Sequence, residues 1–113
     1  MRVSEVFNIH TKTPGNTRRH WTIEAREARE QRTMVKNRLK YACNLPPLPV
    51  RVKLTRYSPR MLDKHNTWGA MKHIIDGIAD AFGIDDSDER LVIEQPQQKI
   101  AKTHAVLVEI ETI

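Results

Sequence analysis

The sequence predicts an α/β (α+β) fold, a small mixed β-sheet with elements in the order β-α-β-α-β-β and the helices packed on the sheet. Two patterns carry this prediction. Residues 50–57, VRVKLTRY, alternate apolar and basic side chains, which is typical of a strand with one face on the core. Residues 66–82 repeat apolar side chains at helical spacing and end before a glycine. A chain of 113 residues is long enough for one domain, residues 1–113, with a modest core.

The first half of the chain is expected to hold a strand and a long helix. Partial alternation indicates a strand at residues 3–11, and TPGN at 13–16 is a turn, because its Pro, Gly and Asn suit turn backbone. The helix is expected to start with Thr22 as its N-cap and to run to about Cys43. NLPPLP at 44–49 then ends it, because proline lacks a backbone donor and blocks helical geometry.

The strand at 50–57 is expected to turn its apolar residues toward the core. Arg51 and Lys53 then lie on the outer face, and the pattern leaves open whether Arg56 joins them. This strand therefore predicts a basic outer surface on the sheet.

The remaining elements follow from the second apolar pattern. A helix is expected at 66–82, with Gly83 as its C-cap, because glycine adopts left-handed backbone without strain. Strands follow at 91–95 and 104–112. Pro96 indicates a sheet edge or a break between them, since it cannot donate to a neighbouring strand.

Composition narrows the choice of partners. The chain has 19 Lys and Arg against 14 Asp and Glu, a net charge of +5, which favours nucleic acid first and an anionic membrane surface second. No apolar run approaches the ~18 residues of a membrane span. The N-terminal MRVSEVFNIH lacks the apolar stretch of a signal peptide, so we expect a cytoplasmic protein and no membrane partner. The one cysteine, Cys43, cannot form an internal disulfide, and we interpret it as a partly buried hydrophobe.

Acidic residues gather at both ends of the second predicted helix. LDKHN places an Asp, a His and an Asn at its start, and IDDSDE at 84–89 follows its end. Lys72, Asp76 and Asp80 recur every four residues and therefore share one face. A helix of about 17 residues is about 25 Å long. The two acidic groups can meet only if the chain on one side folds back.

Converging carboxylates would give the site a specific chemistry. They suit a hard divalent cation such as Mg²⁺, which prefers oxygen ligands. In a basic protein such a site fits metal-assisted phosphodiester hydrolysis, with a nearby Lys stabilising charge on the phosphate. Plainer interpretations stay open: residues 63–66 as a helix cap, DDSDER as a solvated turn, and Lys72 with Asp76 as a surface ion pair.

The motifs resemble those of the RusA-type Holliday junction resolvases, small endodeoxyribonucleases that are often encoded by phages. The resemblance rests on Asp63-Lys64-His65-Asn66, on Lys72 followed by Asp76, and on Gly83-Ile84-Asp85-Asp86 before the apolar LVI. TPGN followed by RRHW is a looser likeness to the start of the family's first helix. The resemblance implies a homodimer that binds four-way DNA junctions and cuts them symmetrically with Mg²⁺ or Mn²⁺.

The resemblance also implies roles for individual residues. Its catalytic and metal-binding candidates are Asp63, His65, Lys72, Asp85 and Asp86. His65 stands where the family has the second of its three essential aspartates, and imidazole suits Mn²⁺ or Zn²⁺ better than Mg²⁺. His65 therefore leaves open a changed metal, weaker activity, no activity, or a plain surface role. Lys72 follows Asn66 by six residues where the commoner family pattern has three, which is close to one extra helical turn.

Basic and amide side chains around the motifs are the expected DNA contacts. They are Lys12, Asn16, Arg18, Arg19, Arg56, Arg60, Lys64 and Asn66. Trp21 and Trp68 could each pack on the core or stack on an exposed base.

Three functions remain in competition. The leading one is a Mg²⁺-dependent endodeoxyribonuclease that resolves branched DNA in recombination or repair. The second is a catalytically impaired DNA-binding protein on the same scaffold, with His65 as the cause. The third is a basic interaction protein with no nucleic-acid role. A His65→Asp variant separates the first two, and the salt dependence of junction binding separates the third.

Overall fold

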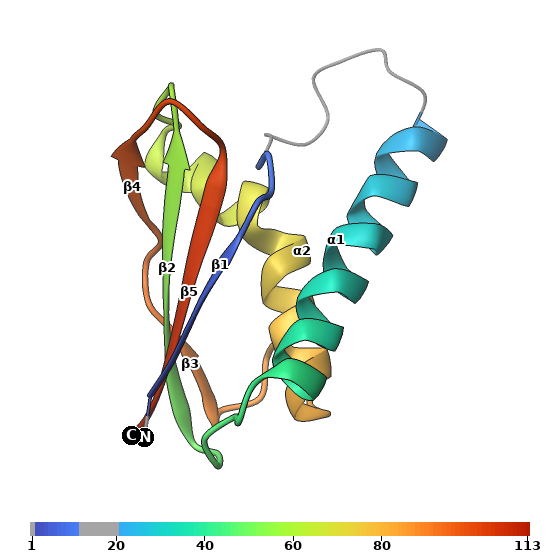
Figure 1. The fold of residues 1–113 in the computed structure, drawn as a ribbon, viewed down its shortest axis with the longest axis vertical. Coiled ribbons are helices and arrows are strands. Elements are labelled where there is room, and N and C mark those ends of the chain that lie inside the picture. The colour runs from blue at the N-terminus through green and yellow to red at the C-terminus, as the bar shows by residue number, and fades with distance from the viewer. Residues whose placement is uncertain (1, 12–20) are drawn as a thin grey trace.

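The computed structural model describes residues 2–11 and 21–113, which form a mixed β-sheet and two helices (Figure 1). The elements are β1 (Arg2–Phe7), α1 (Trp21–Ala42), β2 (Val50–Ser58), α2 (Lys64–Phe82), β3 (Leu91–Ile93), β4 (Gln97–Ile100) and β5 (Ala105–Thr112). The predicted mixed α/β (α+β) class is confirmed, but the order is β-α-β-α-β-β-β. The difference is β4, which the sequence pattern did not indicate.

The sheet has five strands in the order β1-β5-β2-β3, with β4 also paired to β2. β5 runs antiparallel to β1 and to β2, whereas β3 and β4 run parallel to β2. β3 pairs with the first residues of β2 and β4 with the last, so the two short strands share one edge of β2. Pro96, predicted as a break, lies between them.

Alternation along β2 and β5 places the core on one face of the sheet, where α2 packs. The fully buried side chains include Val52, Leu54, Val108, Ile74 and Ile78. On the other face Lys53 is exposed and Arg51 is half-buried, as predicted. The alternation of burial breaks at Thr55, whereas Arg56 has the same parity as Val52 and Leu54 and is buried on their face of the sheet. The open question about Arg56 is therefore answered against an outward position, and its guanidinium finds acceptors inside the fold.

α1 lies against α2 (Figure 1), and the two helices are in close contact at Gly77. A Cβ at Gly77 would lie 2.6 Å from the Arg32 carbonyl oxygen and 2.9 Å from Val35 Cβ, so only glycine fits. α1 begins at Trp21, so Thr22 lies inside the helix and is not its N-cap. In the described parts of the chain, neither helix combines the length and apolar character that a membrane crossing requires.

The end of α2 determines where the following chain goes. Gly83 is the C-cap, as predicted, with a left-handed φ of 71°. The Gly83 N–H donates to Asp80 O and the Ile84 N–H to Ala79 O, which is the double bond pattern of a Schellman motif. This motif reverses the chain, so the residues after α2 return along the helix.

Candidate functional site

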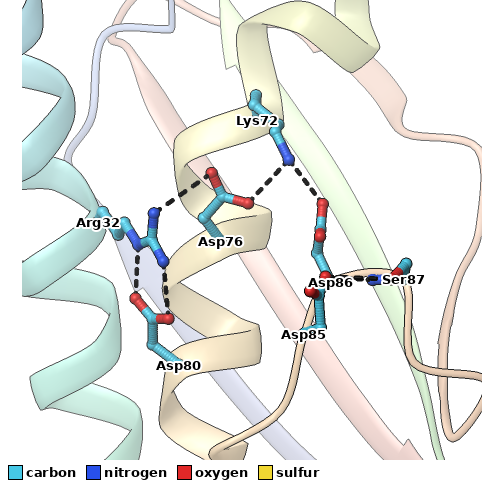
Figure 2. Close-up of polar contacts among 7 residues, drawn as sticks. All are labelled: Arg32, Lys72, Asp76, Asp80, Asp85, Asp86 and Ser87. Atoms are coloured by element: carbon cyan, nitrogen blue, oxygen red, sulfur yellow. Dashed lines mark hydrogen bonds and ion pairs between the residues drawn. The ribbon is translucent and has the colours of Figure 1, made fainter.

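Four aspartates, one lysine and one arginine line an open cavity of about 500 Å³. The lining comes from α1, from α2 between Lys72 and Asp80, and from the chain just after α2 (Figure 2). The charged side chains are Arg32, Lys72, Asp76, Asp80, Asp85 and Asp86, and we call them the acidic cluster.

Lys72 is the centre of the acidic cluster. Its Nζ donates to Asp76 Oδ1 at 2.9 Å and to Asp86 Oδ2 at 2.6 Å (Figure 2). These two bonds raise the pKa of Lys72, the one to Asp86 more strongly. The same ammonium lowers the pKa of Asp86. Lys72 therefore does not pair with Asp76 alone, because Asp86, which follows α2 in the chain, binds the same ammonium.

Asp86 reaches Lys72 because the chain folds back after Gly83. Lys72 lies 11 residues before Gly83 on α2, about 16 Å along the helix axis. The Schellman motif brings the following residues back over that distance. Asp85 is held by its own turn, because its Oδ1 accepts from the Ser87 N–H and from Ser87 Oγ, both at 3.1 Å. The chain after α2 thus folds back along the helix as far as Lys72, and a meeting of the two acidic groups at the ends of α2 stays a prediction.

Arg32 closes the cluster from α1. Its Nε and Nη2 donate to the two carboxylate oxygens of Asp80 at 2.6 and 2.9 Å, and its Nη1 lies 3.8 Å from Asp76 Oδ2 (Figure 2). Arg32 lowers the pKa of Asp80, and Asp80 in turn raises the pKa of Arg32. The sequence patterns did not indicate Arg32, which lies in a mixed-charge stretch. The available signal was Gly77, because a glycine in mid-helix indicates a close helix contact.

The acidic cluster has an excess of negative charge. Four carboxylates and two cations line the cavity, which leaves a net charge of −2 in a chain whose net charge is +5. Carboxylate oxygens are the ligands that Mg²⁺ and Mn²⁺ prefer. The ammonium between Asp76 and Asp86 shows that both carboxylates stabilise one positive charge between them. The donors are therefore of the kind that a hard divalent cation takes, although no three of them in the described chain are arranged around one point.

Asp63 and His65 lie at the other end of α2. Asp63 is the N-cap residue with extended backbone, but its carboxylate makes no capping hydrogen bond. Both side chains are exposed, and none of the hydrogen bonds or ion pairs between described residues joins either to Asp86. Across residues 2–11 and 21–113, no group of three or more His, Cys, Asp or Glu is arranged to hold a metal. A metal site that unites Asp63, His65, Asp85 and Asp86 stays a prediction.

The expected DNA contacts fall into three groups. Lys12, Asn16, Arg18 and Arg19 lie outside the described residues. Arg60 and Lys64 are exposed just before and at the start of α2, and Asn66 is half-buried. Arg56 is buried, and its contact with DNA stays a prediction. Trp68 is 38% exposed and its indole donates to Gln95 Oε1, so it lies on the surface and not in the core.

No family model matches the chain, and no curated protein matches it. The resemblance to the RusA-type resolvases therefore rests on the motif residues of this sequence. The structure adds that four of those residues, Lys72, Asp76, Asp85 and Asp86, line one cavity.

Proposed function

We propose that this chain is a divalent-cation-dependent endodeoxyribonuclease that cuts four-way or otherwise branched DNA in recombination or repair. The observation that carries the proposal is the Lys72 ammonium held between Asp76 and Asp86, beside Asp85, in an open polar cavity. Carboxylates from two separate segments around one lysine form a local arrangement suited to phosphate chemistry.

The residues of the cluster divide the chemistry between them. Asp76, Asp85 and Asp86, which line one cavity, would supply the oxygen ligands for Mg²⁺ or Mn²⁺. When bound, such an ion polarises a phosphate oxygen and lowers the pKa of its bound water. Lys72 provides the positive charge that faces the phosphate. Arg32 is a positioning residue, because it holds Asp80 in place and lies beside Asp76.

The basic surface supports a nucleic-acid partner. With a net charge of +5, the chain attracts phosphates outside the acidic cluster, and exposed Arg60 and Lys64 lie at the start of α2. We further propose a homodimer in the cytoplasm of a bacterial or phage-infected cell, because a two-fold pair of sites matches the symmetry of a four-way junction. Sedimentation of the free protein and of its junction complex tests the dimer.

Cleavage of a synthetic four-way junction tests the proposed activity. End-labelled junction is incubated with the wild-type protein and Mg²⁺, Mn²⁺ or a chelator. We expect cutting with a metal ion and none with the chelator. Asp86→Asn is expected to abolish cutting. Asp88→Asn is the matched control. It also removes one negative charge from the chain after α2, but Asp88 pairs with Arg90 and does not line the cavity. Equal cutting by both variants would contradict the proposal.

A second candidate, junction binding without cutting, is favoured by the position of His65. His65 makes no described contact with the acidic cluster and offers no negative charge to a metal ion. If the wild type binds but does not cut junctions with either metal, and His65→Asp cuts, the binding function is correct. Junction affinity should fall steeply with salt for both candidates, because phosphate contacts release counterions. Salt-independent or absent binding would indicate an interaction protein with no nucleic-acid role.

A further inference from the structure

A second cavity, of about 410 Å³, opens near the end of β2 and has the opposite character from the acidic cluster. Its polar lining comes from His10, Thr11, Arg56, Ser58, Arg60 and His104. No carboxylate belongs to its described lining. Its size lies within the ~300–1,000 Å³ typical of small-ligand sites. We call it the Arg56 cavity.

Arg56 is a buried cation with only neutral partners. The residue is 4% exposed. Its Nε donates to Thr11 Oγ1 at 2.7 Å, and its Nη1 donates to the Arg60 carbonyl oxygen at 2.7 Å and to Gln98 Oε1 at 3.2 Å. Burial lowers the pKa of Arg56, and no described carboxylate opposes that effect. Charged groups this deeply buried are usually paired with an opposite charge. The missing counter-charge points to an anionic ligand.

The guanidinium has donors left for such a ligand. In the described part of the chain, no acceptor contacts its Nη2, although the residue lines the cavity. Its orientation is fixed, because Gln98 is itself held by two bonds to the Leu62 backbone, at 2.8 and 2.7 Å. An arginine held in one orientation binds an anion without first losing side-chain freedom.

Further polar groups line the same cavity. Ser58 Oγ and His104 Nδ1 lie 3.2 Å apart, and the His104 ring stacks on His10 with 3.7 Å between ring centroids. The cavity thus combines a guanidinium with hydroxyl and imidazole groups. That arrangement suits a tetrahedral anion with several acceptor oxygens.

We propose that the Arg56 cavity binds a phosphate group, with Arg56 as its fixed cation and His104 and Ser58 as further contacts. The phosphate is either free or the terminal phosphate of a nucleic-acid strand. This site shares no residue with the acidic cluster and does not depend on the proposed nuclease function. A purely structural Arg56 would leave the cavity without affinity for phosphate.

Titration of the full chain with inorganic phosphate at constant ionic strength tests the inference. The ¹⁵N NMR signal of the Arg56 side chain is expected to shift and saturate, and calorimetry gives the affinity. Arg56→Met is expected to bind phosphate about tenfold to a hundredfold more weakly, since it loses charge-assisted hydrogen bonds. Arg51→Met is the matched control on the same strand, because Arg51 already pairs with Glu94 at 3.5 Å. Its affinity should equal that of the wild type.

A second comparison identifies the source of the phosphate. A 5′-phosphorylated dinucleotide that binds more tightly than inorganic phosphate indicates a strand end, and equal affinity indicates free phosphate. Both outcomes support the site. If Arg56→Met does not fold, His104→Asn replaces it, with weaker phosphate binding expected. The inference is overturned if neither ligand shifts the wild-type Arg56 signal in a saturable way, or if the folded variants bind phosphate as the wild type does.

Discussion

Substitution of Gly77 by alanine tests how closely α1 and α2 approach at the acidic cluster. An added Cβ would meet the Arg32 carbonyl oxygen at 2.6 Å and Val35 Cβ and Cγ1 at 2.9 and 3.1 Å. The carbonyl belongs to the backbone of α1 and cannot rotate away. Gly77→Ala must therefore move the two helices apart, and Arg32, whose side chain holds Asp80, moves with α1.

Two effects of opposite sign determine the change in stability. Overpacking of a tight contact costs about 1–3 kcal/mol. Alanine in place of glycine in a helix interior stabilises by about 1 kcal/mol. Because backbone is one of the contacts, we take the upper part of the overpacking range. Gly77→Ala should then lower the free energy of unfolding by about 1–2 kcal/mol.

Urea unfolding measures the stability, and NMR titration measures the pKa of Asp80. Because Gly77→Ala displaces Arg32, it should also raise the pKa of Asp80 toward its ordinary value of 3.8. Gly83→Ala is the control. Nothing lies within 4 Å of a Cβ there, but φ is +71°, so it should destabilise through backbone strain alone and leave the Asp80 pKa unchanged. A Gly77→Ala protein as stable as the wild type, with an unchanged Asp80 pKa, would refute the reasoning.

Three further predictions concern ionisable groups. In the folded state the pKa of Asp80 lies below its ordinary value of 3.8. The ion pair between Asp80 and the half-exposed Arg32 should therefore stabilise the fold by about 0.5–1 kcal/mol above pH 3.8. This stabilisation should be lost as the pH falls through the pKa that Asp80 has in the folded state. Urea unfolding of Asp80→Asn should differ from wild type at neutral pH and converge with it in strong acid, and a constant difference would contradict the pair. Lys72→Met should raise the pKa of Asp86, measured by carboxyl NMR titration, whereas Lys64→Met, away from the cluster, should not. Burial, and to a lesser degree Glu5, raise the pKa of the Cys43 thiol. Alkylation of Cys43 at neutral pH should therefore be slower in the folded protein than in the unfolded chain. Equal alkylation rates in the two states would contradict the raised pKa.

Local signals predicted the parts of the fold that local chemistry determines. Gly83 ends α2 because only its left-handed backbone completes the Schellman motif, and the prolines at 46–49 keep α1 from continuing. The alternation along β2 correctly placed Lys53 outside. Each of these features depends on residues adjacent in sequence.

The features that sequence reasoning missed depend on distant partners. QQKI shows no strand pattern and becomes β4 because the end of β2 offers a free edge for pairing. Arg32 joins the acidic cluster because Gly77 lets α1 approach. Neither of these contacts has a periodic pattern along the chain.

In the candidate site, too, spacing along the sequence predicted the local features, and contacts between distant residues were not predicted. The spacing of Lys72, Asp76 and Asp80 predicted their common face. That Asp86 would fold back onto Lys72 depends on the direction in which the chain leaves Gly83, which is set by packing in three dimensions.

Binding of Mn²⁺ to the acidic cluster tests the central claim most directly. Mn²⁺ is paramagnetic and broadens the NMR signals of nearby nuclei. We predict that substoichiometric Mn²⁺ first broadens the carboxyl signals of Asp76, Asp85 and Asp86, and that added Mg²⁺ reverses this broadening by competing for the same site. Asp86→Asn should weaken the broadening, whereas Asp88→Asn should leave it unchanged. Broadening that begins elsewhere in the protein, or that is the same in both variants, would contradict it.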